Sequence, residues 1–228
     1  IVFDDADLDR ALDAVVFMIY SLNGERCTSS SRLLVQRSIH DEFVAGLAER
    51  VRKIRVGHPL DLATEVGPLI HPRHCEKVLS YAAIARQDGA SVAVGGGPAA
   101  RPDLPAGGQW VQPTLFTNAS ASMRIAQEEI FGPVLTVIPH DGDDDAVRIA
   151  NDSAYGLGGG VWAGSDERAS AVARRIRTGQ VDINGGVWNP AAPFGGFKQS
   201  GIGRENGVYG LEEFLEYKSL QYRPAPSA

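Results

Sequence analysis

Residues 157–184, LGGGVWAGSDERASAVARRIRTGQVDIN, contain the pattern that decides the fold. The apolar run at residues 157–162 predicts a strand, residues 166–176 predict a helix, and residues 180–184 predict a second strand. A strand, a helix and a strand joined by short turns are typical of α/β proteins, in which the two strands lie parallel in one sheet. The connection between them is expected to be a right-handed crossover.

The rest of the chain repeats this alternation. An acidic start and apolar residues at helical spacing predict a helix over residues 7–22. Ser38 is placed to cap the next helix, which Gly57 ends, and Pro72 and Gly89 bound a third. Further strands are predicted at residues 1–3, 33–35, 91–94, 110–116 and 134–138, and a short helix at 143–149. The sequence predicts an α/β fold with a largely parallel, twisted sheet flanked by helices.

The composition is that of an ordinary globular protein. The 228 residues are 43% hydrophobic and 22% charged, and 22 basic against 28 acidic side chains give a formal net charge of −6. This composition excludes disorder as the main state, and a mildly acidic chain without a basic stripe is a poor nucleic-acid binder. Because no stretch approaches the roughly 18 apolar residues of a membrane span, we expect no membrane partner.

The cysteines and histidines narrow the chemistry further. Two cysteines, Cys27 and Cys75, are too few for a disulfide framework in a chain of this length, which favours a reducing, cytoplasmic compartment. The five histidines have no ligand spacing backed by thiols or carboxylates, so no metal site is predicted. His71 and His74, three residues apart, are interpreted as solvated residues at a helix start.

Cys27 lies in the polar run NGERCTSSS, residues 23–31, between a predicted helix and a predicted strand. A cysteine in such a loop can be exposed, as a nucleophile must be, and the neighbouring Arg26 would favour its thiolate. The alternative is a small buried residue without chemistry. Cys75 falls inside a helical pattern and is interpreted as structural.

A second segment, QEEIFGPV at residues 127–134, carries two adjacent carboxylates before a strand interrupted by Gly132 and Pro133. Adjacent like charges gain nothing structurally, whereas a carboxylate on a rigid turn can accept a pair of ligand hydroxyls. The alternative is an ordinary solvated turn.

The third segment is PFGGFKQSGIGRE at residues 193–205, whose glycines and aromatic residues predict a shaped loop that walls a pocket. It is not a dinucleotide fingerprint, because no G-x-G-x-x-G turn from strand to helix with a later acidic residue accompanies it. Residues 158–160, three glycines inside a strand pattern, are interpreted as a place of close backbone packing.

Taken in order, these three segments resemble the NAD(P)-dependent aldehyde dehydrogenase superfamily. The resemblance extends over essentially the whole chain and includes GPL at residues 67–69, QPTLF at 112–116 and ANDSAYGL at 150–157. It implies that a small-molecule aldehyde is oxidised to a carboxylic acid with NAD or NADP, through a thiohemiacetal and then a thioester on a cysteine.

The resemblance also implies a role for particular residues. The family's nucleophile matches Cys27, whose backbone N–H would supply half of the oxyanion hole. Glu129 would hold the nicotinamide ribose hydroxyls, and Phe131 would pack beside that end of the cofactor. Phe194 would line the aldehyde tunnel, and Glu205 matches a position linked to proton relay.

The departures from the family concern what precedes the match. Family members are longer, and the nucleotide-binding domain, the general-base glutamate and the oxyanion asparagine would fall upstream of Ile1 or are missing here. Because the chain starts at Ile1 without a methionine, inside an apolar run, we expect a fragment. Because the base and the phosphate-binding site that the family uses are missing, we expect this fragment to be inactive alone. It is interpreted as a catalytic domain, residues 1–210, and a tail, residues 211–228.

The tail carries the family's oligomerisation strand, expected at residues 217–222 after a short helix at 211–215. The resemblance therefore implies a homodimer or homotetramer, and we expect the strand either to pair with a second copy or to be poorly ordered.

Alternatives remain at the level of function. NGERCT at residues 23–28 and PLIHP at 68–72 are similar to bacterial hydroxymuconic-semialdehyde dehydrogenases. One rival is the CoA-acylating branch, in which CoA rather than water resolves the thioester. Another is a truncated chain that serves only as an oligomerisation module.

Overall fold

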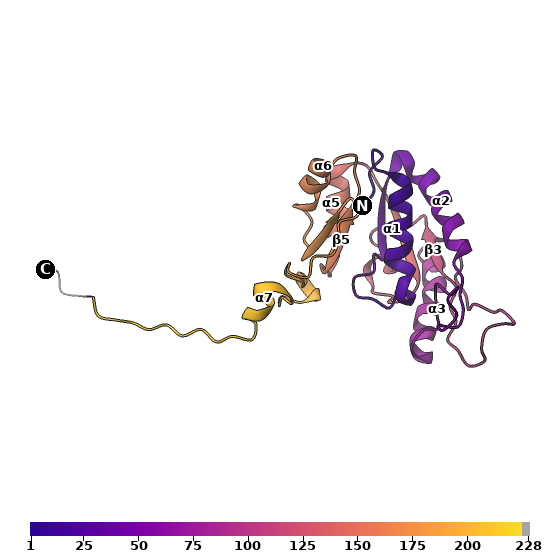
Figure 1. Cartoon of the computed structure of the whole chain (residues 1–228). Coiled ribbons are helices and arrows are strands. Elements are labelled where there is room, and N and C mark those ends of the chain that lie inside the picture. The colour runs from indigo at the N-terminus through magenta and orange to yellow at the C-terminus, as the bar shows by residue number, and fades with distance from the viewer. Residues whose placement is uncertain (225–228) are drawn as a thin grey trace.

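The computed structural model describes residues 1–224, and its larger sheet has the strand order β1-β4-β3-β2 (Figure 1). The strands are β1 (Arg32–Gln36), β2 (Ser91–Val94), β3 (Thr114–Thr117) and β4 (Val134–His140). β4 pairs with β1 and β3 in parallel, as expected, but β2 pairs with β3 antiparallel, so the sheet is mixed. The reason lies in residues 95–113, which contain no helix that could return the chain to the other end of the sheet.

Residues 157–184 form the predicted strand–helix–strand unit. β5 (Gly158–Val161) and β6 (Gln180–Ile183) pair in parallel, joined through α6 (Asp166–Ala173). The N-terminal segment lies between the two sheets, because Val2 bridges to Val35 of β1 and to Trp162 after β5. This confirms the extended segment expected at residues 1–3.

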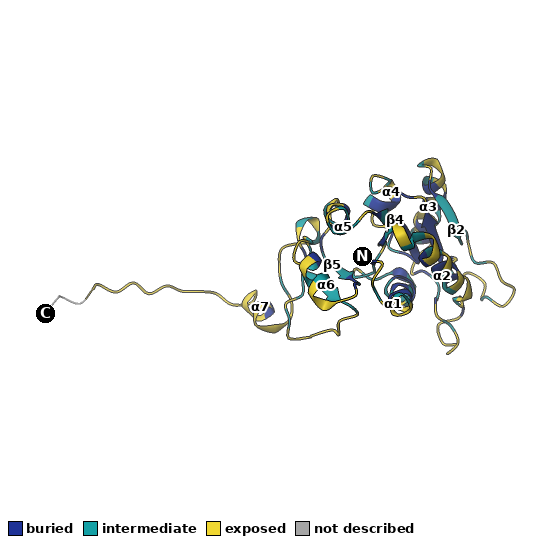
Figure 2. Ribbon diagram, turned by 90° about the horizontal axis from the view of Figure 1, so that it is seen from above, coloured by how far each residue is buried: buried dark blue, intermediate teal, exposed yellow. Residues whose placement is uncertain are grey.

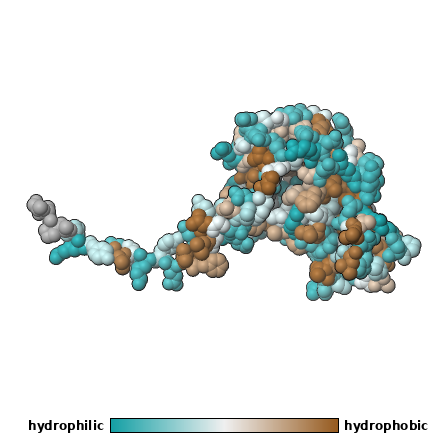
Figure 3. All heavy atoms as spheres, viewed as in Figure 1, coloured by the Kyte–Doolittle hydropathy of each residue, from teal (hydrophilic) through white to brown (hydrophobic). Residues whose placement is uncertain are grey.

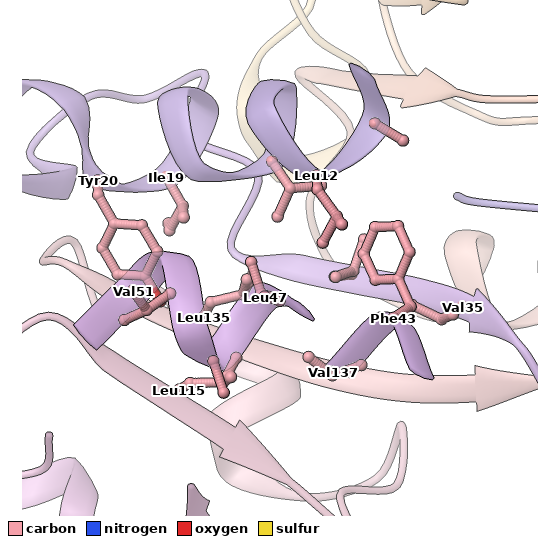
Figure 4. Packing of buried hydrophobic residues seen from close by; sticks show 14 of the residues in the cluster. Leu12, Ile19, Tyr20, Val35, Phe43, Leu47, Val51, Leu115, Leu135 and Val137 are labelled. Atoms are coloured by element: carbon pink, nitrogen blue, oxygen red, sulfur yellow. The ribbon is translucent and has the colours of Figure 1, made fainter. Parts of the chain in front are cut away.

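Helices cover both faces of the larger sheet. The helices are α1 (Leu8–Tyr20), α2 (His40–Lys53), α3 (Pro72–Gln87), α4 (Arg124–Gln127), α5 (Asp143–Asn151) and α7 (Gly207–Glu212). On one face α1 and α2 pack on Leu115 and Leu135, as Figure 4 shows. On the other face α3 packs on Phe116 and Val134. Both faces of the strands are therefore buried, as parallel pairing favours.

Helix boundaries follow local chemistry, with one correction. Asp7 caps α1 by accepting from the Arg10 amide at 3.2 Å, and Pro72 stands in the first turn of α3. Ser38 caps no helix: it lies in a 3-10 turn (Arg37–Ile39), and its hydroxyl donates to Asp4 instead. α2 starts only at His40 and ends before the expected Gly57.

The glycine run in β5 does not mark close packing, contrary to the expectation. A Cβ atom placed on Gly158 or Gly160 would meet backbone atoms no closer than 3.9 and 3.7 Å, and at Gly159 nothing lies within 4 Å. Each of the three glycines could therefore carry a Cβ atom without a clash, so the prediction was wrong.

The helix of the tail has other bounds than expected, and the tail strand, expected to pair with a second copy, pairs with no described residue of this chain. α7 begins at Gly207 and ends before the helix expected at residues 211–215 is complete. Residues 217–222 join no strand within the described part of the chain; they are exposed and extend away from the sheets (Figures 1 and 2). Residues 225–228, the end of the expected tail, lie outside the described residues.

Candidate active site

The Cys27 loop packs directly on the segment that follows the carboxylate pair. After α1 the chain makes a 3-10 turn (Ser21–Gly24), in which Asn23 and Gly24 have φ of 60° and 68°. A Cβ atom on Gly24 would lie 2.0 Å from the Gly132 carbonyl oxygen, so only glycine permits this approach. Two motifs far apart in the sequence therefore meet through their backbones.

Polar side chains fix the loop in place. The Asn23 side chain accepts from the Gly67 amide at 2.6 Å and donates to the Pro68 carbonyl at 3.2 Å. Glu25 Oε1 accepts from the Ile70 amide at 3.1 Å. The loop is therefore anchored to the segment before α3, from which these amides and the carbonyl come.

Cys27 itself is accessible to solvent. It is exposed, in a turn closed by the Ser29 amide donating to the Arg26 carbonyl at 2.9 Å. Within residues 1–224 the Cys27 backbone N–H donates no hydrogen bond, so it is free to meet a ligand oxygen. Cys27 is therefore exposed, as a nucleophile must be, and not buried; its role as nucleophile stays a prediction.

The two other side chains named with Cys27 have structural partners. Arg26 donates to the Met18 carbonyl at 2.8 Å, at the end of α1, and lies over the Phe17 ring. This contact satisfies a helix-terminal carbonyl, and the expected effect of Arg26 on the thiolate stays a prediction. Cys75 is buried in α3, where burial and then the neighbouring Glu76 raise the pKa of its thiol, as a structural cysteine requires.

The adjacent carboxylates have different surroundings. Glu128 accepts from the Tyr81 hydroxyl at 2.9 Å and from Arg124 at 2.9 and 3.1 Å. The Arg124 guanidinium and then the Tyr81 hydroxyl hold the pKa of Glu128 below its ordinary value. The Glu129 side chain is exposed and has no hydrogen-bond partner among the described residues, while its carbonyl accepts from Lys77 at 2.8 Å. Of the pair, only Glu129 has a carboxylate available to a ligand.

Phe131 adopts an unusual backbone conformation held by a histidine. Its φ is +61°, in a region that non-glycine residues rarely occupy. The Phe131 carbonyl accepts from His74 Nε2 at 2.6 Å, and His74 Nε2 lies 3.6 Å from Glu25 Oε1. The interpretation of His74 as a solvated helix-start residue was wrong, because its side chain is 17% exposed. No sequence signal marks it, since its partners are remote in the chain.

The third motif closes into a loop that docks on the β5–β6 unit. The amides and carbonyls of Phe194 and Glu205 pair antiparallel, at 2.8 and 2.6 Å. Lys198 donates to the Asn151 and Ser153 carbonyls at 2.8 and 2.9 Å. A Cβ atom on Gly179 would lie 1.6 Å from the Gly195 carbonyl oxygen, so the loop rests directly on the backbone before β6.

A cavity of about 710 Å³ joins the first motif to the third. Cys27, Phe194 and Glu205 line it together, with Leu157 and Arg204. Glu129 and Phe131 are not among its lining residues; they adjoin the Cys27 loop through the contact between Gly24 and Gly132. The Cys27 loop therefore adjoins both the cavity and the carboxylate turn.

The described residues contain neither a metal-ion cluster nor a membrane-spanning helix. No group of three or more histidine, cysteine, aspartate or glutamate side chains within residues 1–224 is arranged to hold a metal ion. None of the helices formed by these residues has the length and apolar character needed to cross a membrane.

Comparison with known proteins identifies the family. The model of the aldehyde dehydrogenase family matches residues 1–220. The chain belongs to the aldehyde dehydrogenase family. It is 43% identical to a betaine aldehyde dehydrogenase of Bacillus subtilis over 231 residues, covering 100% of this chain and 46% of that protein.

Solved structures agree with this assignment. The HpcC protein of Thermus thermophilus has a TM-score of 0.93 and 47% identity, over 100% of this chain and 45% of that one. A Staphylococcus aureus betaine aldehyde dehydrogenase in complex with NAD+ has a TM-score of 0.92 and 45% identity, over 94% and 43%. The chain thus spans less than half the length of these relatives, and the α/β fold corresponds to part of theirs.

Proposed function

We propose that the chain supplies the thiol-bearing catalytic part of an NAD(P)-dependent aldehyde dehydrogenase, with residues 1–210 as the catalytic domain and 211–228 as the tail. The observation that carries the proposal is the exposed Cys27 in a cavity shared with Phe194 and Glu205, and the family supplies the reaction class. A nucleophile, a free backbone donor and a carboxylate in one cavity are the groups that thioester chemistry uses.

Cys27 forms the covalent bond. Its thiolate attacks the aldehyde carbon, and the carbonyl electrons move to the oxygen, which accepts a hydrogen bond from the free Cys27 N–H. Loss of hydride from the thiohemiacetal carbon leaves a thioester on Cys27. Water then attacks the thioester carbon, so that the acid departs and the thiolate returns. Glu205, a carboxylate in the same cavity, relays the proton that the attacking water gives up.

The residues beside the Cys27 loop fit the nicotinamide end of the cofactor. Glu129 presents a carboxylate without a protein partner, which suits a pair of ribose hydroxyls, and Phe131 offers an apolar ring beside it. When bound, NAD or NADP accepts the hydride. Phe194 lines the cavity that Cys27 also lines, and it contacts the aldehyde chain.

The proposed substrate is a small-molecule aldehyde, and the relatives of similar identity include betaine aldehyde dehydrogenases and HpcC. The exposed tail supports a homo-oligomer, either a dimer or a tetramer. The proposed place of action is the cytoplasm, where cysteines remain reduced.

The test is turnover by the complete polypeptide that carries these residues. Aldehydes are supplied with NAD or with NADP, and the reduced cofactor and the product are measured with and without CoA. We expect a carboxylic acid whose formation does not require CoA. A product formed only with CoA would assign the acylating branch instead, and no cofactor reduction with any aldehyde would leave the role of an oligomerisation module.

A further inference from the structure

One face of α3 donates to the carboxylate turn at three successive places. His74, Lys77 and Tyr81 are spaced three and four residues apart, so their side chains lie along one side of the helix. Tyr81 donates to Glu128 Oε2 at 2.9 Å, Lys77 to the Glu129 carbonyl at 2.8 Å, and His74 to the Phe131 carbonyl at 2.6 Å. This helix face therefore donates to Glu128, Glu129 and Phe131 in turn.

The turn needs an external restraint. Phe131 at φ +61° is in a conformation that persists only where the surroundings impose it. A carbonyl oxygen can only accept, so the short contact places the proton of His74 on Nε2. Without this bond the Phe131 peptide could relax, and Gly132, on which Gly24 rests, would move with it.

His74 also reaches the nucleophile loop. Its Nε2 lies 3.6 Å from Glu25 Oε1, and the two side chains are only 17% and 14% exposed. Glu25 stands two residues before Cys27 and is itself fixed by the Ile70 amide. One imidazole therefore lies between the carboxylate turn and the loop that carries the thiol.

We infer that His74 is a positioning residue that holds the Glu128–Phe131 turn and the Cys27 loop in register, so that the hydride leaving the Cys27 adduct faces its acceptor. This inference rests on the proposed function. Lys77 assists by fixing the Glu129 carbonyl alone, without a contact to the nucleophile loop. The two donors therefore differ in what they reach, and that difference can be measured.

The experiment uses His74→Leu, His74→Gln and Lys77→Met in the complete polypeptide, with Arg73→Ala as the matched control. Arg73 is the exposed neighbour of His74 on α3, and no hydrogen bond from its side chain to the described residues is present. Two rates are measured: cofactor reduction in a single turnover, and alkylation of Cys27 by iodoacetamide without cofactor. Thermal unfolding of each variant is followed alongside.

We expect His74→Leu to slow cofactor reduction by about tenfold or more and to change the alkylation rate of Cys27 by about threefold or more. His74→Gln should restore both rates to within about threefold of the parent, because its amide can donate to the same carbonyl. Lys77→Met should slow reduction but leave alkylation unchanged. Arg73→Ala should change neither.

The inference is overturned if His74→Leu and Arg73→Ala agree in both rates, or if His74→Gln is as impaired as His74→Leu while both unfold at the parent temperature. If His74→Leu does not fold, cofactor reduction by the other two variants decides: His74→Gln should stay within about threefold of the parent while Lys77→Met is slower, and a His74→Gln variant slower than Lys77→Met would contradict the inference. Failure of the proposed function is seen separately, as a parent protein that reduces no cofactor, and the alkylation rates still test the link.

Discussion

The part of the molecule built on the four-stranded sheet, called here the closed half, is buried more fully by its own residues than the part built on the β5–β6 pair. The second part, with α7 and the tail, is called the open half. In the four-stranded sheet β4 is buried along all but one residue, covered by α1 and α2 on one face and α3 on the other. In the β5–β6 unit every residue of β6 is only half-buried, and β5 is mostly glycine with open space at Gly159. The first half is closed on itself, whereas the second presents a surface that the described residues do not cover.

The candidate site is divided in the same way. Cys27, Glu129 and Phe131 belong to the closed half, where hydrogen bonds from α3 and the segment before it fix their backbones. Phe194 and Glu205 belong to the open half, beside α7, where exposed apolar side chains gather (Figure 3). The Cys27 loop, anchored by these hydrogen bonds, thus lines a cavity together with residues from the less covered part of the chain.

The largest expected effect separates the two cysteines, both of which lie in the closed half. Cys27→Ser in the complete polypeptide should lower the rate of aldehyde oxidation by several orders of magnitude, because serine has no comparably accessible anion at neutral pH. Cys75→Ser, in the core of α3, should leave the rate of the folded enzyme nearly unchanged. Steady-state rates of both variants check this, and an active Cys27→Ser enzyme would refute the nucleophile.

The next effect compares one glycine from each half. Gly24→Ala should reduce the free energy of unfolding by about 3 kcal/mol, because the backbone has φ +68° and the new Cβ meets the Gly132 carbonyl. Gly159→Ala should change it by no more than about 0.5 kcal/mol, since nothing lies within 4 Å. Urea denaturation midpoints measure both changes, provided that the slope of the unfolding free energy against urea concentration is the same in each variant. Equal losses would show that β5 is packed as tightly as the Cys27 loop.

A smaller effect distinguishes the adjacent carboxylates. Glu129→Gln should weaken transition-state binding by about 1.5–3 kcal/mol, because a charge-assisted bond to a ribose hydroxyl is lost. Glu128→Gln should matter less to the rate, because its carboxylate serves Arg124 and Tyr81. Transient kinetics of cofactor reduction compare the two. A greater sensitivity at Glu128 would reverse the assignment.

The smallest effect concerns the open half and its tail. If residues 217–222 pair with a second copy, truncation after Glu216 should lower the mass in solution by about half, because isologous pairing through an extended segment is lost. Light scattering on the full chain and the truncated chain measures this. Equal masses for both would mean that the tail contributes nothing to assembly.

The sequence predicted local structure best where pattern and packing agree. The strand at residues 91–94 and the start of α3 at Pro72 were predicted at the residues observed. The direction of β2 was not, because the pattern marks a strand without its partner, and only the helix-free connection before β3 sets the pairing. The prediction that Ser38 caps a helix was wrong for a similar reason, because its hydroxyl donates to Asp4 in another segment.

The site shows the same limit. The order of three motifs was enough to select Cys27, Phe194 and Glu205, which the fold brings into one cavity. The sequence could not predict that Glu128 has protein partners and Glu129 has none, nor the contacts of His74. Tyr81 lies 47 residues from Glu128, and His74 lies 57 residues from Phe131. Such contacts exist only after α3 has packed on the sheet.

If Cys27 carries the acyl group, the mass of the Cys27 peptide should show it after the complete polypeptide is rapidly mixed with an aldehyde and cofactor and quenched with acid. We expect the acyl mass to appear on this peptide, to disappear as free acid forms, and never to appear on the Cys75 peptide. Acid production without an acyl adduct on Cys27, or with the adduct on another residue, would contradict it.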